Sequence, residues 1–271
     1  MSIITISRGS FSRGKEVAEK VAKKLSYRTV SREIILAASE DFNIPEIQLI
    51  RAIHDPPSIL DSFTFGKERY LAQIESTLLD RLRKDNIVYH GLAGHFFVRS
   101  ISHVLKVRII ADLEERLRTK MAREKISKER AMEELKKDDE ARRQWSLKLY
   151  GIDTRDSGLY DLVLHIHKLS IENAVNIICD TVKLEQFRTT PESQKAMDDL
   201  AIAAMVKAKI VKKYPNVKVA ARAGEALIHV QASETLESVI VEDIECVARQ
   251  VPGVRKVRVH LVPTTLFDGH L

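Results

Sequence analysis

The chain has 271 residues, of which 44% are hydrophobic and 30% are charged. This length allows two domains with separate cores, and the composition is that of a globular protein, not of a disordered or fibrous one. The net charge of +6 suits an anionic partner, and no basic-aromatic stripe indicates sequence-specific binding of nucleic acid.

Two features of the sequence bear on location. No apolar run approaches the ~20 residues of a membrane-spanning helix, and the N-terminus lacks the basic and then apolar pattern of a signal peptide. Cys179 and Cys246 lie far apart in apolar helical patterns, which favours buried thiols over a disulfide framework or a metal site. We therefore expect a cytoplasmic protein.

The first predicted element is a buried strand, because Ile3 to Ile6 form a short β-branched run. A glycine-bearing loop from Gly9 to Lys15 follows, and apolar residues at helical spacing then predict a helix over 16–25. A strand, such a loop and a helix in this order are the setting of a phosphate-binding loop, in which the first amides of the helix face an anion.

The loop matches the Walker pattern, Gly9-x-x-x-x-Gly14-Lys15, up to its lysine. The next residue of that pattern is Ser or Thr, whose hydroxyl ligates magnesium, whereas Glu16 stands here. The motif leaves two interpretations open. One is a phosphate site, and the other is an ordinary strand-turn-helix in which Lys15 begins a solvated helix.

Further strands and helices alternate along the chain. Strands are predicted at 27–30, 87–91, 106–111 and 160–166. Helices are predicted from Ser31, at 68–83 and at 170–182, the last with Ser170 as its N-cap. A charged helical hairpin is predicted over 113–149, and short helices and loops over 42–65. This alternation predicts a five-stranded parallel sheet with helices on both faces.

Ligands of parallel sheets bind beyond the carboxyl ends of the strands. Four segments fall at those ends: the loop 9–15, Ser31-Arg32, the run 91–94 and Asp112. Their convergence favours the phosphate site over the ordinary turn.

The pattern changes after a polar, proline-containing stretch at 188–196, which we interpret as a linker. A helix from 198, a hairpin of strands over 217–230, a helix over 236–251 and a strand over 257–262 follow. The sequence therefore predicts two domains, 1–187 and 197–271, and the second is a small α+β module of order αββαβ.

The segment from Met1 to Phe187 resembles the cytidylate kinase-like branch of the nucleoside monophosphate kinases. The motifs that carry the resemblance are Ile6-Ser7-Arg8, Gly14-Lys15-Glu16, Arg32-Glu33-Ile34, Asp139 with Arg142, Tyr150-Gly151 and Tyr160-Asp161-Leu162. The C-terminal module resembles a BON domain through its element order, Gly224 in the hairpin and Pro252-Gly253-Val254 before the last strand.

The resemblance implies a P-loop fold with a helical lid and transfer of the γ-phosphoryl group of ATP to CMP, dCMP or a related small acceptor, with Mg2+ bridging the phosphates. The implied catalytic residues are Lys15, Arg116, Arg123, Asp139 and Arg142, with Arg143 as a further lid candidate. The implied ATP-binding residues are Gly9, Ser10, Ser12, Arg13, Gly14, Lys15 and Glu16, and the implied acceptor-binding residues are Arg8, Arg32 and Gly91.

The chain departs from the family pattern at several positions. Phe11 and Arg13 stand where the family loop has glycine, Leu92 replaces an arginine after the third strand, and Ser31 replaces an aspartate. A nucleotide sensor that acts through the BON-like module is therefore the alternative to an active kinase.

Other interpretations also stay open. The C-terminal module could bind a ligand or protein partner, and the pattern is compatible with a homo-oligomer. His165 and His167 share one face of a strand, but with no carboxylate or cysteine at fixed spacing we expect no metal site.

Overall fold

The computed structural model describes residues 2–31, 66–91, 94–232 and 237–263. Contacts between Cα atoms divide the chain into two compact units. One comprises Met1–Ser62 and Lys84–Ser193, and the other comprises Phe63–Arg83 and Gln194–Leu271.

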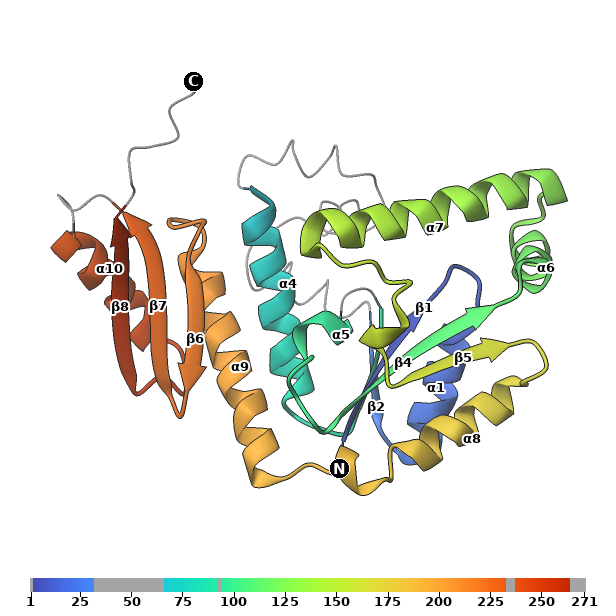
Figure 1. Ribbon diagram of the computed structural model, residues 1–271, viewed down its shortest axis with the longest axis horizontal. Coiled ribbons are helices and arrows are strands. Elements are labelled where there is room, and N and C mark those ends of the chain that lie inside the picture. The colour runs from blue at the N-terminus through green and yellow to red at the C-terminus, as the bar shows by residue number, and fades with distance from the viewer. Residues whose placement is uncertain (1, 32–65, 92–93, 233–236, 264–271) are drawn as a thin grey trace. The chain divides into compact units, whose positions relative to one another are not determined.

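The first unit is built on a five-stranded sheet in which every pairing is parallel, in the order β2-β3-β1-β4-β5. Its elements are β1 (Ile3–Arg8), α1 (Gly14–Leu25), β2 (Arg28–Val30), β3 (Ile87–His90), α5 (Gly94–Phe97), β4 (Val104–Ala111), α6 (Leu113–Glu124), α7 (Lys128–Tyr150), β5 (Leu162–Ile166) and α8 (Ile171–Thr181) (Figure 1). Because all five strands are parallel, their carboxyl ends lie at one edge of the sheet.

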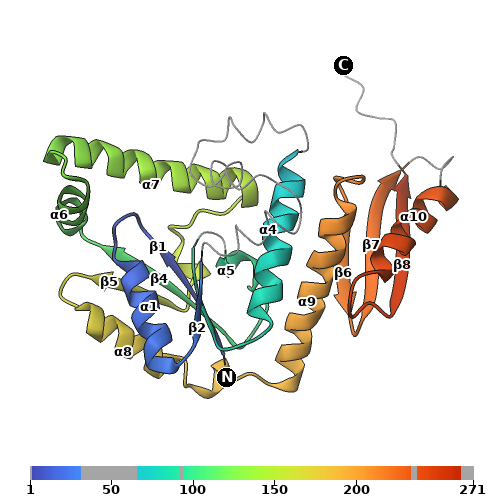
Figure 2. The same ribbon diagram turned by 180° about the vertical axis from the view of Figure 1, so that it is seen from behind.

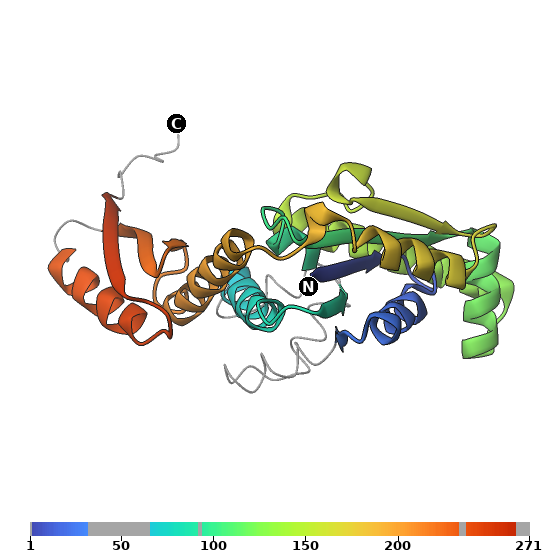
Figure 3. The same cartoon turned by 90° about the horizontal axis from the view of Figure 1, so that it is seen from below.

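The main core lies between the sheet and the helices α1 and α8. Ile4 of β1, Leu105 of β4, Val21 of α1 and Ile178 of α8 are fully buried in one apolar cluster. Figure 2 shows α1 lying over the strands, and Figure 3 shows α1 and α8 next to each other. The pair thus covers one face of the sheet, which explains the apolar stripes of both helices.

Helices α6 and α7 form the predicted charged hairpin. Ser127 caps α7, since its hydroxyl accepts a bond of 3.3 Å from the Arg130 N–H. The hairpin has a small core of its own, in which Leu117, Ala131 and Leu135 are buried.

The second unit contains α4 (Gly66–Leu82), α9 (Pro191–Ile210), β6 (Lys218–Arg222), β7 (Glu225–Ala232), α10 (Glu237–Arg249) and β8 (Lys256–Pro263). α4 belongs here because its Gln73 side chain donates to the Ala208 carbonyl of α9 at 3.0 Å. β7 pairs with β6 antiparallel and with β8 parallel, and its Ile228 and Val230 are buried.

The predicted fold class is confirmed: a parallel five-stranded sheet with helices, and a small α+β module with the order α9-β6-β7-α10-β8. The Ser170 cap is also confirmed, as a capping box with Asn173. None of the described helices is both long and apolar enough to cross a bilayer.

The described elements differ from the predicted ones at two places, the start of α9 and the short helix α5. α9 begins at Pro191, inside the stretch interpreted as a linker, because proline suits the first turn of a helix. α5 was not predicted, since four residues are too few to show a helical period. The helix expected from Ser31 and the stretch 42–65 lie largely or wholly outside the described residues, and the domain boundaries 1–187 and 197–271 stay a prediction.

The β6–β7 turn yields a test of the second unit. Gly224 has φ +77°, and a Cβ there would lie 2.8 Å from the Gly253 carbonyl oxygen. Gly151 has φ +67° with nothing within 4 Å. We expect Gly151→Ala to lower the free energy of unfolding by about 1–2 kcal/mol, which is the cost of the left-handed backbone alone. Gly224→Ala should lower it by about 1–3 kcal/mol more, because its new Cβ also clashes with the rigid backbone at Gly253. Urea unfolding followed by circular dichroism checks this, and equal losses would contradict it.

Candidate active site

The loop between β1 and α1 has an unusual backbone. Phe11 and Arg13 have φ of 56° and 60°, in the left-handed region that non-glycine residues rarely adopt. At Gly14 a Cβ would lie 2.7 Å from the Cβ of Arg8, so the close approach of helix and strand requires glycine there. These angles carry the chain from the end of β1 directly into the first turn of α1.

The first turn of α1 leaves its amides free. The first main-chain bond of the helix runs from the Val17 N–H to the Arg13 carbonyl at 3.1 Å. Among the described residues, the amides of Gly14, Lys15 and Glu16 have no acceptor. Three free N–H groups at the positive end of a helix dipole form an anion-binding site.

A cavity of about 220 Å3 adjoins this loop. Its lining is rich in arginine and consists of Ser7, Arg8, Gly9, Ser12, Arg108, Ile110, Ala111, Arg116, Asp139, Arg142, Arg143, Thr154 and Arg155. Six arginines therefore line one space with a single carboxylate, that of Asp139, and one of the six, Arg143, pairs with Asp153 at 2.9 Å. Such an excess of fixed positive charge attracts a polyanion.

Asp139 and the loop hold Arg116 in place. Its Nη2 donates to Asp139 at 2.7 Å, and its Nε donates to the Ser10 carbonyl at 2.7 Å. On the other side of the cavity, Arg108 donates to the Tyr160 hydroxyl at 3.1 Å. The hydroxyl of Tyr160 in turn donates to the Thr154 carbonyl at 3.0 Å.

Other arginines on the cavity have no such partner. The side chains of Arg8, Arg142 and Arg155 donate to no acceptor within the described part of the chain, and the Nε of Arg8 is buried. Burial lowers the pKa of Arg8 and of Arg142, and the positive charge of Arg142 lowers that of Arg8 further. Arg8 and Arg142 are half-buried, whereas Arg155 is exposed. Removing a cation from water without an acceptor is costly, and a bound anion would supply acceptors for Arg8 and Arg142.

Several predicted ATP-site residues meet at this place. Gly9 and Ser12 line the cavity, and the Ser12 hydroxyl donates to the Gly9 carbonyl at 2.9 Å. Ser10 is buried beside them, and its hydroxyl oxygen has no hydrogen-bond partner among the described residues. Arg13 and Glu16 form an ion pair of 2.8 Å with each other.

Other predicted residues lie elsewhere. The Lys15 side chain is 63% exposed, lies 3.6 Å from Glu19 and does not line the cavity. Arg123 lies with its Cζ 5.9 Å from the centre of the Phe11 ring. Gly91 follows β3, where a Cβ would lie 2.5 Å from the Tyr89 hydroxyl. Arg32 is outside the described residues, and the assignment of all these residues to roles stays a prediction.

Sequence reasoning did not single out Arg108, Thr154 or Arg155. A signal exists for Arg108, since an arginine interrupts the apolar run of β4 close to its carboxyl end. Arg155 lies between α7 and β5, where neither motif nor period marks it.

His165 and His167 do have a carboxylate partner, which spacing did not reveal. The Asp112 carboxylate lies 2.9 Å from His165 Nε2 and 2.5 Å from His167 Nδ1. No group of three or more His, Cys, Asp or Glu within the described residues could hold a metal ion. The three side chains form a polar cluster that includes Asp112 at the start of α6.

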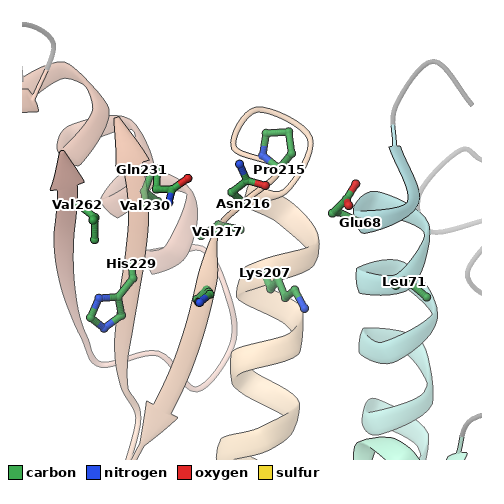
Figure 4. A pocket seen from close by; sticks show the side chains of 11 residues that line it. Glu68, Leu71, Lys207, Pro215, Asn216, Val217, His229, Val230, Gln231 and Val262 are labelled. Carbon is green, nitrogen blue, oxygen red and sulfur yellow. The ribbon is translucent and has the colours of Figure 1, made fainter. Parts of the chain in front are cut away.

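A larger hollow, of about 850 Å3, lies in the second unit between α4, α9 and the sheet (Figure 4). Its cations do not converge as those of the arginine cavity do. Lys207 forms an ion pair of 3.3 Å with Glu75, and the remaining lining mixes apolar and neutral side chains with Glu68, Lys218 and His229. We therefore place the candidate site in the first unit.

The fold and the site together define a P-loop type of α/β protein, with free helix amides and an arginine-lined cavity at the carboxyl end of β1 and a helical hairpin beside them. The profile of the Cytidylate kinase-like family matches residues 3–168, and the chain belongs to this family.

Similar proteins agree with this assignment. The cytidylate kinase of Staphylothermus marinus is 28% identical over 187 residues, covering 68% of this chain and 97% of that protein. The cytidylate kinase of Pyrobaculum islandicum is 29% identical over 187 residues, covering 67% and 93%. A crystal structure of an uncharacterized protein from Eubacterium ventriosum shares the fold, with a TM-score of 0.50 and 21% identity over 67% of this chain and 98% of that one.

Buried histidines near the site predict a loss of stability in acid. Burial, and then the positive charge of Arg108, lowers the pKa of His95 to about 3. Burial, followed by Arg8, lowers the pKa of His90 to about 4. Between about pH 6.5 and pH 4 the unfolded chain binds these protons and the folded chain does not. The free energy of unfolding therefore falls as the pH falls through this range, by about 3 kcal/mol for each histidine.

We expect His95→Phe, which keeps a flat ring and removes the titration, to flatten this acid slope. Urea unfolding at several pH values between 6.5 and 4 measures it. A variant that loses as much stability as the original chain over this range would contradict the assignment.

Proposed function

We propose that this protein transfers the γ-phosphoryl group of ATP to a nucleoside monophosphate, with CMP or dCMP as the acceptor. The observation that carries the proposal is the arginine cavity beside the free amides of α1, because two phosphate-bearing substrates must be brought together against their mutual repulsion. The names of the relatives from Staphylothermus marinus and Pyrobaculum islandicum support cytidylate as the acceptor.

Each group at the site has a part in this proposal. The amides of Gly14, Lys15 and Glu16 bind the phosphates of the donor. Arg116 and Arg142 stabilise the charge that spreads over the transferred group, and Asp139 orients Arg116. Arg8 and Arg108 lie on the β-strands at the floor of the cavity and bind the acceptor phosphate.

Lys15 reaches the phosphates only after a change of rotamer. Its ion pair with Glu19 is 3.6 Å long and both side chains are more than half exposed. Such exposed pairs contribute little to stability, so an anion at the helix start can readily displace Glu19.

The described residues fit ATP and Mg2+. The guanidinium groups of Arg8 and Arg142, which have no acceptor within the described residues, suit a polyphosphate, and the Ser10 hydroxyl would be an oxygen ligand of the kind that magnesium takes. When bound, the metal neutralises charge on the phosphate oxygens. Glu16 is held by Arg13 and Lys20, which keeps its charge away from the phosphates.

We also propose that the second unit is a BON-like domain. The element order and the positive φ of Gly224 and Gly253 support this. A ligand or protein partner of that unit stays a prediction.

The proposal predicts a specific acceptor. Release of ADP from ATP, followed with a coupled assay, should be stimulated at least tenfold by CMP or dCMP over AMP, GMP and UMP, because a site that hydrogen-bonds one base rejects the others. A folded protein that releases ADP with none of them, or that binds no ATP by calorimetry, would contradict the proposal.

The lid arginines provide a second test with a matched control. Arg142 lines the cavity, whereas Arg118 on α6 is 75% exposed and paired with Glu115. We expect Arg142→Ala to lower kcat by about 100-fold or more, since it removes a charge that acts on the transition state. Arg118→Ala should leave kcat within about threefold of the original value. Equal effects of the two substitutions would overturn the role of Arg142.

A further inference from the structure

Phe11 occupies a place in the phosphate loop that its residue type does not favour. Its φ of 56° lies in the left-handed region, where an aromatic residue is strained and glycine is not. A strained residue persists only where surrounding contacts hold it. The contacts of Phe11 therefore show what this residue does.

The ring of Phe11 packs into the helical hairpin. It packs against the hairpin core of Leu117, Ala131 and Leu135, as do the partly buried side chains of Met121, Ile126 and Met132. The phosphate loop thus supplies an aromatic residue to the core of α6 and α7.

Two cations of α6 also face the ring. The Nζ of Lys120 lies 4.8 Å from the ring centre, and the Cζ of Arg123 lies 5.9 Å from it. Lys120 is held there, because its side chain is 4% exposed and forms ion pairs of 2.8 and 2.9 Å with Glu124 and Glu134. A cation fixed near an aromatic ring is an attractive contact, and it is stronger when desolvated.

A second link joins the hairpin to the neighbouring peptide group. The Ser10 carbonyl accepts from Arg116 Nε of α6 at 2.7 Å, and Arg116 is itself held by Asp139 of α7. In a planar trans peptide the carbonyl of Ser10 and the N–H of Phe11 point in opposite directions. The bond from Arg116 therefore sets the direction of the Phe11 amide as well.

We infer that Phe11 is a positioning residue that couples the α6–α7 hairpin to the phosphate loop, so that the loop aims its amides at an anion only while the hairpin is docked on the ring. The expected effect on catalysis rests on the proposed function. The coupling between hairpin and loop does not, because it depends only on contacts within the first unit.

The test compares two replacements of Phe11 in the full chain. Phe11→Asn removes the ring but introduces a residue that adopts the left-handed backbone readily. Phe11→Leu keeps an apolar side chain that can pack against the hairpin core. We expect Phe11→Asn to raise the KM for ATP and lower kcat, with kcat/KM reduced by about 100-fold, and Phe11→Leu to restore it to within about fivefold.

Two further readouts test the coupling without turnover. Hydrogen exchange of the amides of α6 and of Val17, whose bond to the Arg13 carbonyl closes the first turn of α1, should become faster together in Phe11→Asn. Met132→Ala, which trims the apolar cluster against which Phe11 packs, should produce the same change. Calorimetric titration with inorganic pyrophosphate should show weaker binding by both variants, and near-original binding by Phe11→Leu.

The outcomes separate the two claims. If the original protein turns over no acceptor but binds pyrophosphate in a manner that depends on Phe11, the proposed function fails and the coupling stands. If Phe11→Asn retains the original kcat/KM and pyrophosphate affinity, or if Met132→Ala changes exchange in the hairpin but not in α1, the coupling is wrong. Failure of the original protein to bind pyrophosphate would overturn it as well.

Discussion

The site depends on the electrostatic repulsion among six arginines that line one cavity, of which only Arg116 and Arg143 form ion pairs within the described residues. The groups come from five places in the chain: β1, β4, α6, α7 and the segment before β5. Like charges so close together raise the free energy of the folded protein, and salt screens those inside a cavity less than those at the surface. Parallel strands bring Arg8 and Arg108 to one edge, and the hairpin adds the others. An anion in the cavity therefore stabilises this arrangement of strands and hairpin.

The hairpin is connected to the strand end through a few polar contacts with defined geometry. Arg116 joins three segments, because its two donors reach the Ser10 carbonyl and the Asp139 carboxylate. Asp139 compensates the positive charge of Arg116 and fixes the position of its guanidinium group. The placement of positive charge and the placement of the loop are thus controlled by the same side chain, and the aromatic ring of Phe11 adds an apolar contact to this polar connection.

The general plan of the protein could be predicted from the sequence, because the β-branched runs and the helical spacing of apolar residues reflect burial directly. The runs at β1 and β4 and the Ser170 cap are examples. The rest depends on contacts between distant residues. No local pattern shows that Arg108 and Arg155 face Arg8, that Asp112 lies between His165 and His167, or that Lys15 pairs with Glu19 and not with the cavity. The sequence shows that Phe11 and Arg13 stand where glycine is expected. It does not show that Phe11 packs against the α6–α7 hairpin or that Arg13 pairs with Glu16.

The strand order β6-β7-β8 has a consequence for behaviour at high concentration. It places β6 and β8 at the two borders of a small sheet, where unpaired main-chain groups can recruit strands from another molecule. Lys256 and Arg258 on β8 pair with Glu225 of β7, whereas β6 carries Lys218 at its start and Arg222 at its end. Two copies that approached through antiparallel β6 strands would bring these ammonium and guanidinium groups close to each other. The cations of β6 thereby disfavour self-association of the second unit through that strand.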